Sequence, residues 1–437
     1  MELKTFRGGI HPPYNKEATA GKATVEISLP AEVVIPMQQH VGAPNNPTVA
    51  FGDHVEAGQK IGVTDAFISS PVHSSVTGTV KAIEERRNFT GIMVNSVVIK
   101  VDPNQPSKWN EKRDVEGLTP EQIREVAKEG GLVGLGGAAF PTFVKLSPPK
   151  GKPIDTVIIN ACECEPFLTC DHRLMLERPD ALLSGLKLMM KAVGAAKGYI
   201  GIEANKKDAS DLLKSQATRV TGVEVVDLEV KYPEGAEKML IDAITGRRVP
   251  PGRLPSEVSV LVQNVQTAVA LSDAATTGKP VIERVITVTG PAMRQPKNVM
   301  AKIGTPIEHI IEQCGGMSSE VVKVIMGGPM TGWAQNDLTA SVVKGTSGIL
   351  ALTQEVLDLN SEEQCVSCDK CLEVCPMFLM PNFIVKYSRR GKWDLANKYG
   401  ARDCFECGCC SFECPAKIPH VAYVRKAKAE IAAAEKK

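Results

Sequence analysis

The chain has 437 residues, of which 43% are hydrophobic, with 51 lysines and arginines against 50 aspartates and glutamates. This length suggests about three domains, and the formal net charge of +1 argues against nucleic acid as a partner. The N-terminus lacks the apolar segment of a signal peptide, and no run approaches the ~18 apolar residues of a membrane-spanning helix. We therefore expect a reducing cytosolic setting, with any membrane attachment made through partners.

Residues 1–110 are predicted to form a β-rich domain, in which 25–29 alternates like a strand. Segments 52–62 and 70–80 resemble the two halves of a lipoyl- or biotinyl-type flattened barrel, a fold that presents a carrier lysine at a hairpin tip. The corresponding tip here contains His73 and no lysine, so the resemblance implies the shape without the cargo. We expect His73 to be a solvated turn histidine.

Residues 111–282 are predicted to form an α/β domain. Thr119 and Pro120 are typical of a helix N-terminus, and glycines at 130–131 of its end. Downstream, helices and short apolar strands alternate, which favours a layered and mostly parallel sheet. The predicted strands are 155–160, 199–202, 224–231 and 258–262, and the predicted helices are 179–193, one from about 205, 235–244 and one from about 265.

A glycine-rich loop at 134–142, followed by Lys145, is the first candidate ligand site. Such a loop lets backbone N–H groups approach a phosphate or a flat ring closely. It is neither a Rossmann fingerprint, because it follows a helix, nor a Walker loop, because it lacks Gly-Lys-Ser/Thr. Glu163 and Glu165 follow the strand at 155–160, at the edge where parallel sheets bind ligands.

Residues 283–358 are predicted to form a small β-grasp domain, from strands at 284–290 and 322–326 and a helix at 306–314. The tail, 421–437, is rich in Ala, Lys and Glu and is predicted to be a terminal helix.

Within 359–420, the pattern C-x2-C-x2-C-x3-C-P occurs twice. It is the ligand run of bacterial ferredoxins with two clusters, in which the fourth cysteine of each run reaches the other cluster. A structural zinc site is the alternative, but zinc rarely needs the third cysteine and the Cys-Pro, and here the run is doubled. The predicted crossed groups are Cys365, Cys368, Cys371 and Cys414 for one cluster and Cys404, Cys407, Cys410 and Cys375 for the other.

Other cysteines are interpreted as packing residues. Cys409 is expected beside a cluster, and Cys162, Cys164 and Cys170 are expected to be buried free thiols, because free cysteine behaves as a small hydrophobe.

Four motifs in one order carry a family resemblance: the glycine loop with Lys145, Asn-Ala-x-Glu-x-Glu-Pro from Asn160, Tyr-Pro-Glu-Gly-Ala-Glu from Tyr232, and Gln-Asn-Val-Gln-Thr from Gln263. Over residues 115–345 the chain resembles the NADH- and FMN-binding subunit of respiratory complex I. Its full length resembles the C subunit of the Rnf complex, a ferredoxin:NAD oxidoreductase coupled to ion transport. Departures from the complex I pattern are Leu135, Phe143, Cys162 and Ala236.

The resemblance implies a lipoyl-like barrel-sandwich domain, a Rossmann-like FMN/NADH domain, a β-grasp domain and a ferredoxin domain. It implies FMN, NAD(H) and two [4Fe-4S] clusters as cofactors. Phe140 would offer an aromatic face and Lys145 a phosphate-directed charge. The implied catalytic residues are Lys145, Glu165 and Glu237, and the implied cofactor-binding residues are Gly134, Gly136, Gly137, Phe140, Lys145, Asn160, Glu163, Glu165, Tyr232, Gly235, Asn264 and Thr267.

The implied function is electron transfer between NAD(H), FMN and the clusters within an ion-translocating complex. The chain would lie peripherally at the cytoplasmic face of the bacterial membrane, held by membrane subunits and an iron–sulfur B subunit, with ferredoxin an indirect partner. The alternative is a soluble cobalamin reductase of a bacterial microcompartment. The implied site residues argue against a non-catalytic scaffold. A basic group near the clusters could meet an acidic partner, although a solvated face is the simpler interpretation: Lys386, Arg389, Arg390 and Lys392.

Overall fold

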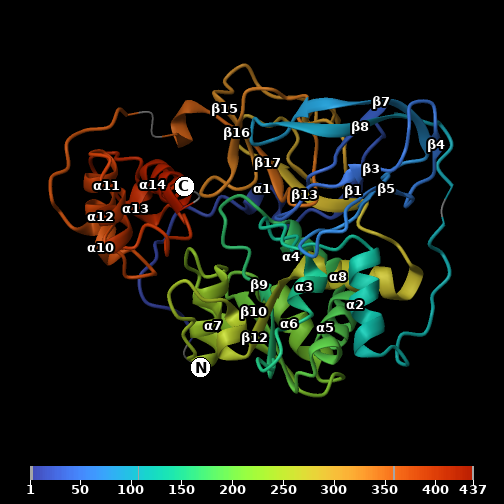
Figure 1. Cartoon of the computed structure of the whole chain (residues 1–437), viewed down its shortest axis with the longest axis horizontal. Coiled ribbons are helices and arrows are strands. Elements are labelled where there is room, and N and C mark those ends of the chain that lie inside the picture. The colour runs from blue at the N-terminus through green and yellow to red at the C-terminus, as the bar shows by residue number, and fades with distance from the viewer. Residues whose placement is uncertain (1–2, 107, 358–359, 436–437) are drawn as a thin grey trace.

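The computed structural model describes residues 3–106, 108–357 and 360–435, and its described residues form four sheets. Figure 1 shows the C-terminal helices as a separate module on one side, the α/β layers below, and the remaining sheets above them. Each of these domains is built from a nearly continuous part of the chain, except that one N-terminal strand joins a sheet formed by residues much later in the sequence. Among the described helices, none is long and apolar enough to span a bilayer.

The barrel domain consists of two small antiparallel sheets, ordered β2-β8-β7-β4 and β3-β5-β6, around a core of valines and isoleucines. His73 is only 4% exposed and faces Lys344, and burial followed by this charge lowers its pKa to about 3. The prediction of a solvated turn was therefore wrong, because the tip packs against the next domains. The strands are β2 (Glu32–Pro36), β3 (Asn46–Pro47), β4 (His54–Val55), β5 (Lys60–Val63), β6 (Val72–His73), β7 (Gly78–Arg87) and β8 (Met93–Val101).

The α/β domain has a four-stranded sheet in the order β11-β10-β9-β12, parallel throughout, as predicted. Its strands are β9 (Thr156–Ala161), β10 (Lys197–Glu203), β11 (Val223–Leu228) and β12 (Val260–Asn264). Apolar cores lie on both faces, so the strands are almost wholly buried. The helices are α2 (Pro120–Glu129), α3 (Thr142–Lys145), α4 (Cys170–Glu177), α5 (Pro179–Val193), α6 (Lys207–Ala217), α7 (Glu237–Thr245) and α8 (Val265–Thr277), with a 3₁₀ turn at Pro255–Val258.

A six-stranded mixed sheet, β1-β14-β13-β17-β15-β16, forms the next domain. Its first strand comes from the N-terminal region, since β1 pairs in parallel with β14. The strand expected in the barrel domain therefore completes a different sheet, while the predicted domain boundaries stay predictions. The elements are α1 (Glu17–Ala20), β1 (Thr24–Glu26), β13 (Glu283–Thr289), β14 (Lys297–Lys302), α9 (Ile307–Gln313), β15 (Lys323–Met326), β16 (Trp333–Gln335), β17 (Gly348–Leu352) and a 3₁₀ turn at Gln354–Val356.

The C-terminal module is helical and has its own small core, in which Ile384 and Val424 are buried. The predicted terminal helix is present as α14, and residues 436–437 of that prediction lie outside the described part of the chain. The helices are α10 (Lys370–Glu373), α11 (Pro381–Ser388), α12 (Trp393–Lys398), α13 (Cys409–Phe412) and α14 (His420–Glu435).

An N-terminal arm, residues 3–16, ties the module to the α/β domain. Ile10 forms an antiparallel bridge with Tyr232, and the N–H of Gly9 donates to the carbonyl of Val374 at 2.9 Å. The arm thus contacts both sides of the boundary between these bodies.

Candidate functional site

A cavity of about 510 Å³ opens at the carboxyl edge of the parallel sheet. Its lining comes from the α/β domain, from the loop after β15 and from the C-terminal module, through Phe405 and Cys407. Ligands bind at this edge in open α/β sheets. The structure brings eight of the predicted site residues to this cavity: Gly136, Gly137, Asn160, Glu163, Glu165, Tyr232, Gly235 and Asn264.

The glycine loop is fixed from behind and open in front. A Cβ on Gly136 would lie 3.2 Å from the side chain of Asn264, and Gly137 has a φ of +104° with nothing within 4 Å of its Cβ position. Thr267 Oγ1 accepts from the N–H of Leu135 at 2.9 Å. The loop therefore presents bare backbone to the cavity, which suits a flat ring such as that of FMN. Thr267 holds the loop and is not among the described residues lining the cavity.

Lys145 and Glu237 lie together but away from the cavity. Lys145 Nζ donates to Glu237 Oε1 at 2.7 Å and to the carbonyl of Val262 at 2.6 Å, so the pair links α3, α7 and β12. Gly134 and Phe140 are likewise not among the described lining residues. The sequence predicted these residues and Glu165 at one nucleotide site, and of this set Glu165 is among the described residues that line the cavity.

The two carboxylates after β9 point in different directions. Glu163 accepts from the N–H groups of Asp171 at 2.7 Å and His172 at 3.1 Å, at the start of α4. Glu165 accepts from the N–H of Met330 at 3.0 Å and from the hydroxyl of Thr331. Burial raises the pKa of Glu165 above its ordinary value. Glu165 thus joins the α/β domain to the loop after β15, across the cavity wall.

Two buried lysines that sequence reasoning missed support this loop. Lys16, from the N-terminal arm, donates to the carbonyls of Glu163 at 2.7 Å, Glu165 at 2.9 Å and Leu168 at 2.6 Å. Lys206 donates to the carbonyl of Cys162 at 2.6 Å and to a carboxylate oxygen of Glu203 at 2.9 Å. Lys16 is 147 residues from Glu163 along the chain, and no local signal indicates that partnership.

The predicted free thiols are buried, as expected: Cys162, Cys164 and Cys170. Cys164 Sγ accepts from the N–H of Gly235 at 3.3 Å, and both residues line the cavity. Burial raises the pKa of this thiol.

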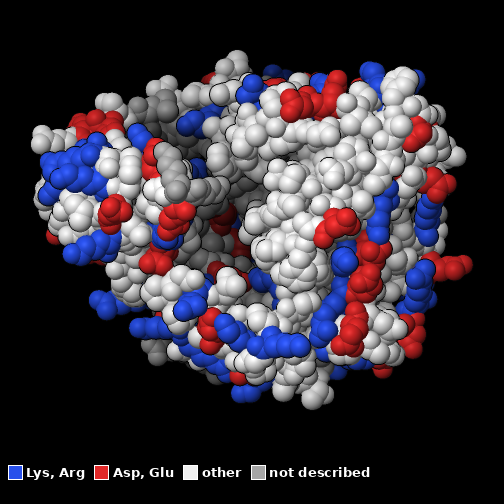
Figure 2. Space-filling view, in the orientation of Figure 1, with Lys and Arg blue, Asp and Glu red and all other residues white. Residues whose placement is uncertain are grey.

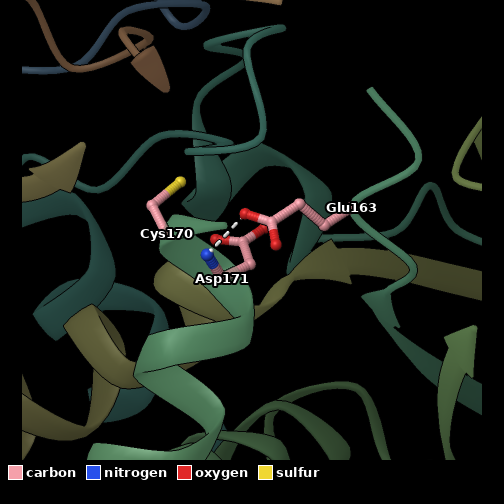
Figure 3. A group of neighbouring side chains, drawn as sticks. All are labelled: Glu163, Cys170 and Asp171. Atoms are coloured by element: carbon pink, nitrogen blue, oxygen red, sulfur yellow. Dashed lines mark hydrogen bonds between the residues drawn. The ribbon is translucent and has the colours of Figure 1, made fainter. Parts of the chain in front are cut away.

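Figure 3 shows Glu163 reaching toward the first turn of α4, where Asp171 and Cys170 lie beside it. Asp171 was not predicted as a site residue, yet it lines the cavity and accepts from Asn264 Nδ2 at 2.6 Å and Gln266 Nε2 at 3.1 Å. Burial and the neighbouring Glu163 raise its pKa to about 6. The carboxylate oxygens are occupied by N–H donors, which disfavours a cation here and leaves a protonatable acid in the cavity wall.

The eight motif cysteines surround two further cavities in the C-terminal module. One cavity is lined by Cys365, Cys368, Cys371 and Cys414, and the other by Cys375, Cys404, Cys407 and Cys410. These are the crossed groups predicted from the spacing, and four motif thiols around each cavity, with Cys409 as a fifth cysteine at the second, fit the donor set of a [4Fe-4S] cluster. Ligation itself stays a prediction. Cys409 is fully buried beside the second group, as expected.

The large cavity and the second cysteine cavity share a wall. Cys407 lines both of them. The hydroxyl of Tyr232 donates to the carbonyl of Cys407 at 2.8 Å, and this tyrosine also lines the large cavity. Cys407 and its hydrogen bond from Tyr232 thus connect the linings of the two cavities.

Family models match the chain in four segments. They are an RnfC barrel sandwich hybrid domain at residues 4–104, a Nuo51 FMN-binding domain at 127–273, an SLBB domain at 285–334 and a 4Fe-4S dicluster domain at 361–427. The second and fourth confirm the predicted FMN and iron–sulfur cofactors.

Relatives that match nearly the full length of the chain agree with these family models. The chain is 47% identical to the C subunit of the Na(+)-translocating ferredoxin:NAD(+) oxidoreductase complex of Acetobacterium woodii, covering 99% of this chain and 98% of the relative. It is 42% identical to the proton-translocating counterpart of Clostridium ljungdahlii, covering 99% and 95%. The C subunit of the ion-translocating oxidoreductase complex of Erwinia tasmaniensis is 38% identical, and the chain covers 54% of its length.

These relatives support the predicted electron-transfer role and give no support to the cobalamin reductase alternative. The fold, the flavin and cluster domains and the full-length identity agree. The chain belongs to the family of Rnf complex C subunits, which are oxidoreductase subunits of ion-translocating complexes.

Proposed function

We propose that this chain exchanges electrons with NAD(H) at the large cavity and passes them through the two cysteine groups to other subunits of a ferredoxin:NAD oxidoreductase complex. The observation that carries the proposal is the shared wall at Cys407, which lines both the large cavity and one cysteine cavity. A bound FMN would accept the electron pair of NADH, and iron–sulfur clusters would carry electrons singly.

Within the cavity, the protein's own task is positioning. The open backbone at Gly137 lets a flat ring approach, while Thr267 and Asn264 hold the loop from behind. The two buried lysines beneath the loop after β9 fix its carbonyls, and so fix the directions of Glu163 and Glu165. Preorganised polar groups of this kind are what a cofactor site needs.

Lys145 and Glu237 are retained as proposed NAD(H) residues. Their ion pair lies outside the cavity lining, so they would meet a part of the nucleotide that extends beyond it. Phe140, within the glycine loop, is proposed to offer its ring to the same ligand.

The two cysteine groups have different places. The group with Cys407 adjoins the large cavity, whereas the group with Cys365 lines a cavity on the far side of α10 and α11. We infer that the group with Cys365 faces the partners. Membership of the family makes the chain one subunit of a larger complex. We further propose that it lies peripherally at the cytoplasmic face, that it contacts an iron–sulfur B subunit and membrane subunits, and that it exchanges electrons with ferredoxin only indirectly.

The proposal is tested by measuring the entry of electrons from NADH separately from their delivery to an acceptor protein. Lys145→Ala and Glu165→Gln should weaken NADH-dependent bleaching of the flavin in anaerobic stopped-flow absorbance, with unchanged iron content. Lys152→Ala is the matched control, because Lys152 also pairs with a glutamate but lies at the exposed surface. Cys371→Ser should leave flavin bleaching nearly intact and block delivery to a one-electron acceptor protein.

Two outcomes would contradict the scheme. In the first, the Lys145 and Glu165 variants bleach at wild-type rates across NADH concentrations. In the second, Cys371→Ser lacks one cluster by iron analysis but delivers electrons normally.

A further inference from the structure

The cysteine cavity on the far side of the module opens to solvent. Cys365 and Cys368 are both exposed, and Val366 between them is 66% exposed. The group with Cys407 is more enclosed, since its members are buried or half-buried. An electron that reaches the far group can therefore leave the protein most directly through the loop at 365–368.

The rim of this opening is basic. Lys370, Lys386, Arg389 and Arg390 line it, against one acidic lining residue, Asp369. Arg389 is engaged by Glu362, whereas no ion pair is recorded among the described residues for Lys370, Lys386 or Arg390. Figure 2 shows lysine and arginine side chains gathered at this end of the molecule, over α11 and α12.

This rim is also held in place by aromatic packing. Lys386 Nζ lies 5.5 Å from the ring centroid of Phe383, which lines the same cavity. Phe383 in turn stacks on Tyr399 with centroids 4.8 Å apart. A positive charge fixed beside the exposed loop gives the surface a defined electrostatic shape.

We propose that this rim, defined by Lys370, Lys386, Arg390 and Val366, is the docking surface for an acidic face of a neighbouring subunit that exposes its own one-electron redox centre. The proposal rests on the proposed function. In the forward direction one electron leaves the cluster held by the far cysteine group and enters the partner's centre. No bond forms and no proton moves, and the reverse transfer runs through the same contact.

The form of the surface favours such a protein over an anionic membrane. Protein interfaces usually have an apolar centre and a polar rim. Here Val366 lies at the centre, and basic side chains without a recorded ion-pair partner among the described residues surround it. Complementary charges speed and orient the encounter. Lipid seated on the loop at 365–368 would instead cover the exit that the far group needs.

The first experiment measures binding. The purified chain, with its clusters, is added to membranes from a strain that lacks it, and the bound fraction is followed by sedimentation at several salt concentrations. The double variant Lys386→Glu/Arg390→Glu should bind at least about tenfold more weakly at ~0.1 M salt, with a flatter salt dependence. Lys150→Glu, an exposed lysine on the loop between α3 and β9, should bind like the wild type.

A photo-crosslinking residue in place of Val366, in the assembled complex, identifies the occupant without charge reversal. The expected product joins this chain to a subunit that carries a flavin or iron–sulfur centre, through a peptide rich in Asp and Glu. This measurement also keeps the proposal testable if the double variant loses its clusters.

Three results would overturn the docking surface: equal binding by wild type and double variant, equally tight binding of wild type to protein-free phosphatidylglycerol vesicles, or a crosslink to a subunit without a redox centre. In each case NADH bleaching of the flavin would remain normal. Loss of that bleaching in the wild-type chain would instead refute the proposed function.

Discussion

The buried lysine of the N-terminal arm gives the sharpest test of how the site is built. In Lys16→Met a side chain of similar length loses its ammonium group. Three carbonyls, of Glu163, Glu165 and Leu168, then lose the donor that holds them at 2.6–2.9 Å. We expect the loop after β9 to open more often, and FMN to bind more weakly.

The loss of local stability in Lys16→Met depends on two opposing free energies: the cost of leaving carbonyls without a donor and the cost of burying the lysine charge. Each buried acceptor left without a donor costs about 1–3 kcal/mol, which gives roughly 3–9 kcal/mol for three. Against this, the wild type bears the cost of burying a charge, several kcal/mol for an ion, and burial lowers the pKa of Lys16. A net loss of about 3 kcal/mol corresponds to roughly a hundredfold change in an equilibrium constant.

Hydrogen exchange with mass spectrometry measures this locally, which suits a multidomain chain that need not unfold in one step. Peptides covering 162–168 should exchange about a hundredfold faster in Lys16→Met. Lys22→Met is the matched control, because Lys22 belongs to the same N-terminal region but is exposed and donates to one carbonyl, that of Pro296. Less than a threefold change, or an equal change in both variants, would refute the reasoning.

Two further predictions concern the cavity wall. The pKa of Asp171 is raised from 3.8 to about 6, so the folded state binds the extra proton, and the contribution of Asp171 to local stability should fall by about 2 kcal/mol as pH rises from 4 to 6.5. Asp171→Asn should flatten that profile in hydrogen exchange of peptides covering α4, corrected for the intrinsic exchange rate at each pH, and parallel profiles would contradict the assignment. A Cβ at Gly328 would lie 2.5 Å from Cδ of Glu165, so Gly328→Ala should break the bond to Met330 and weaken FMN binding about tenfold by fluorescence titration. Gly21→Ala, with nothing near its Cβ position, should not, and equal affinities would refute the role of Glu165.

Local patterns predicted much of this protein. The alternation of apolar strands with capped helices predicted the parallel sheet and α5, because periodicity and capping act within a few residues. The doubled cysteine run predicted which thiols would gather, because a ferredoxin-type pattern carries its crossed geometry in its spacing.

The motifs indicated which residues belong to the ligand region, and the tertiary structure showed which of them line the cavity. Glu165 lines the cavity, whereas Lys145 and Glu237 pair with each other and are not among its described lining residues. Residue type and order indicate that side chains belong to one ligand region. Whether each of them reaches the cavity depends on how α3, α7 and β12 pack.

Contacts between distant segments were decided by tertiary structure alone. His73 is buried because the barrel packs against Lys344, β1 joins a sheet formed some 270 residues later, and Lys16 supports a loop 147 residues away. No local propensity encodes such contacts, since they form only when separately folded surfaces bury their polar groups against one another. The sequence alone thus indicated which cofactors the chain uses and which thiols would gather, and packing determined how the large cavity meets the cysteine group that contains Cys407.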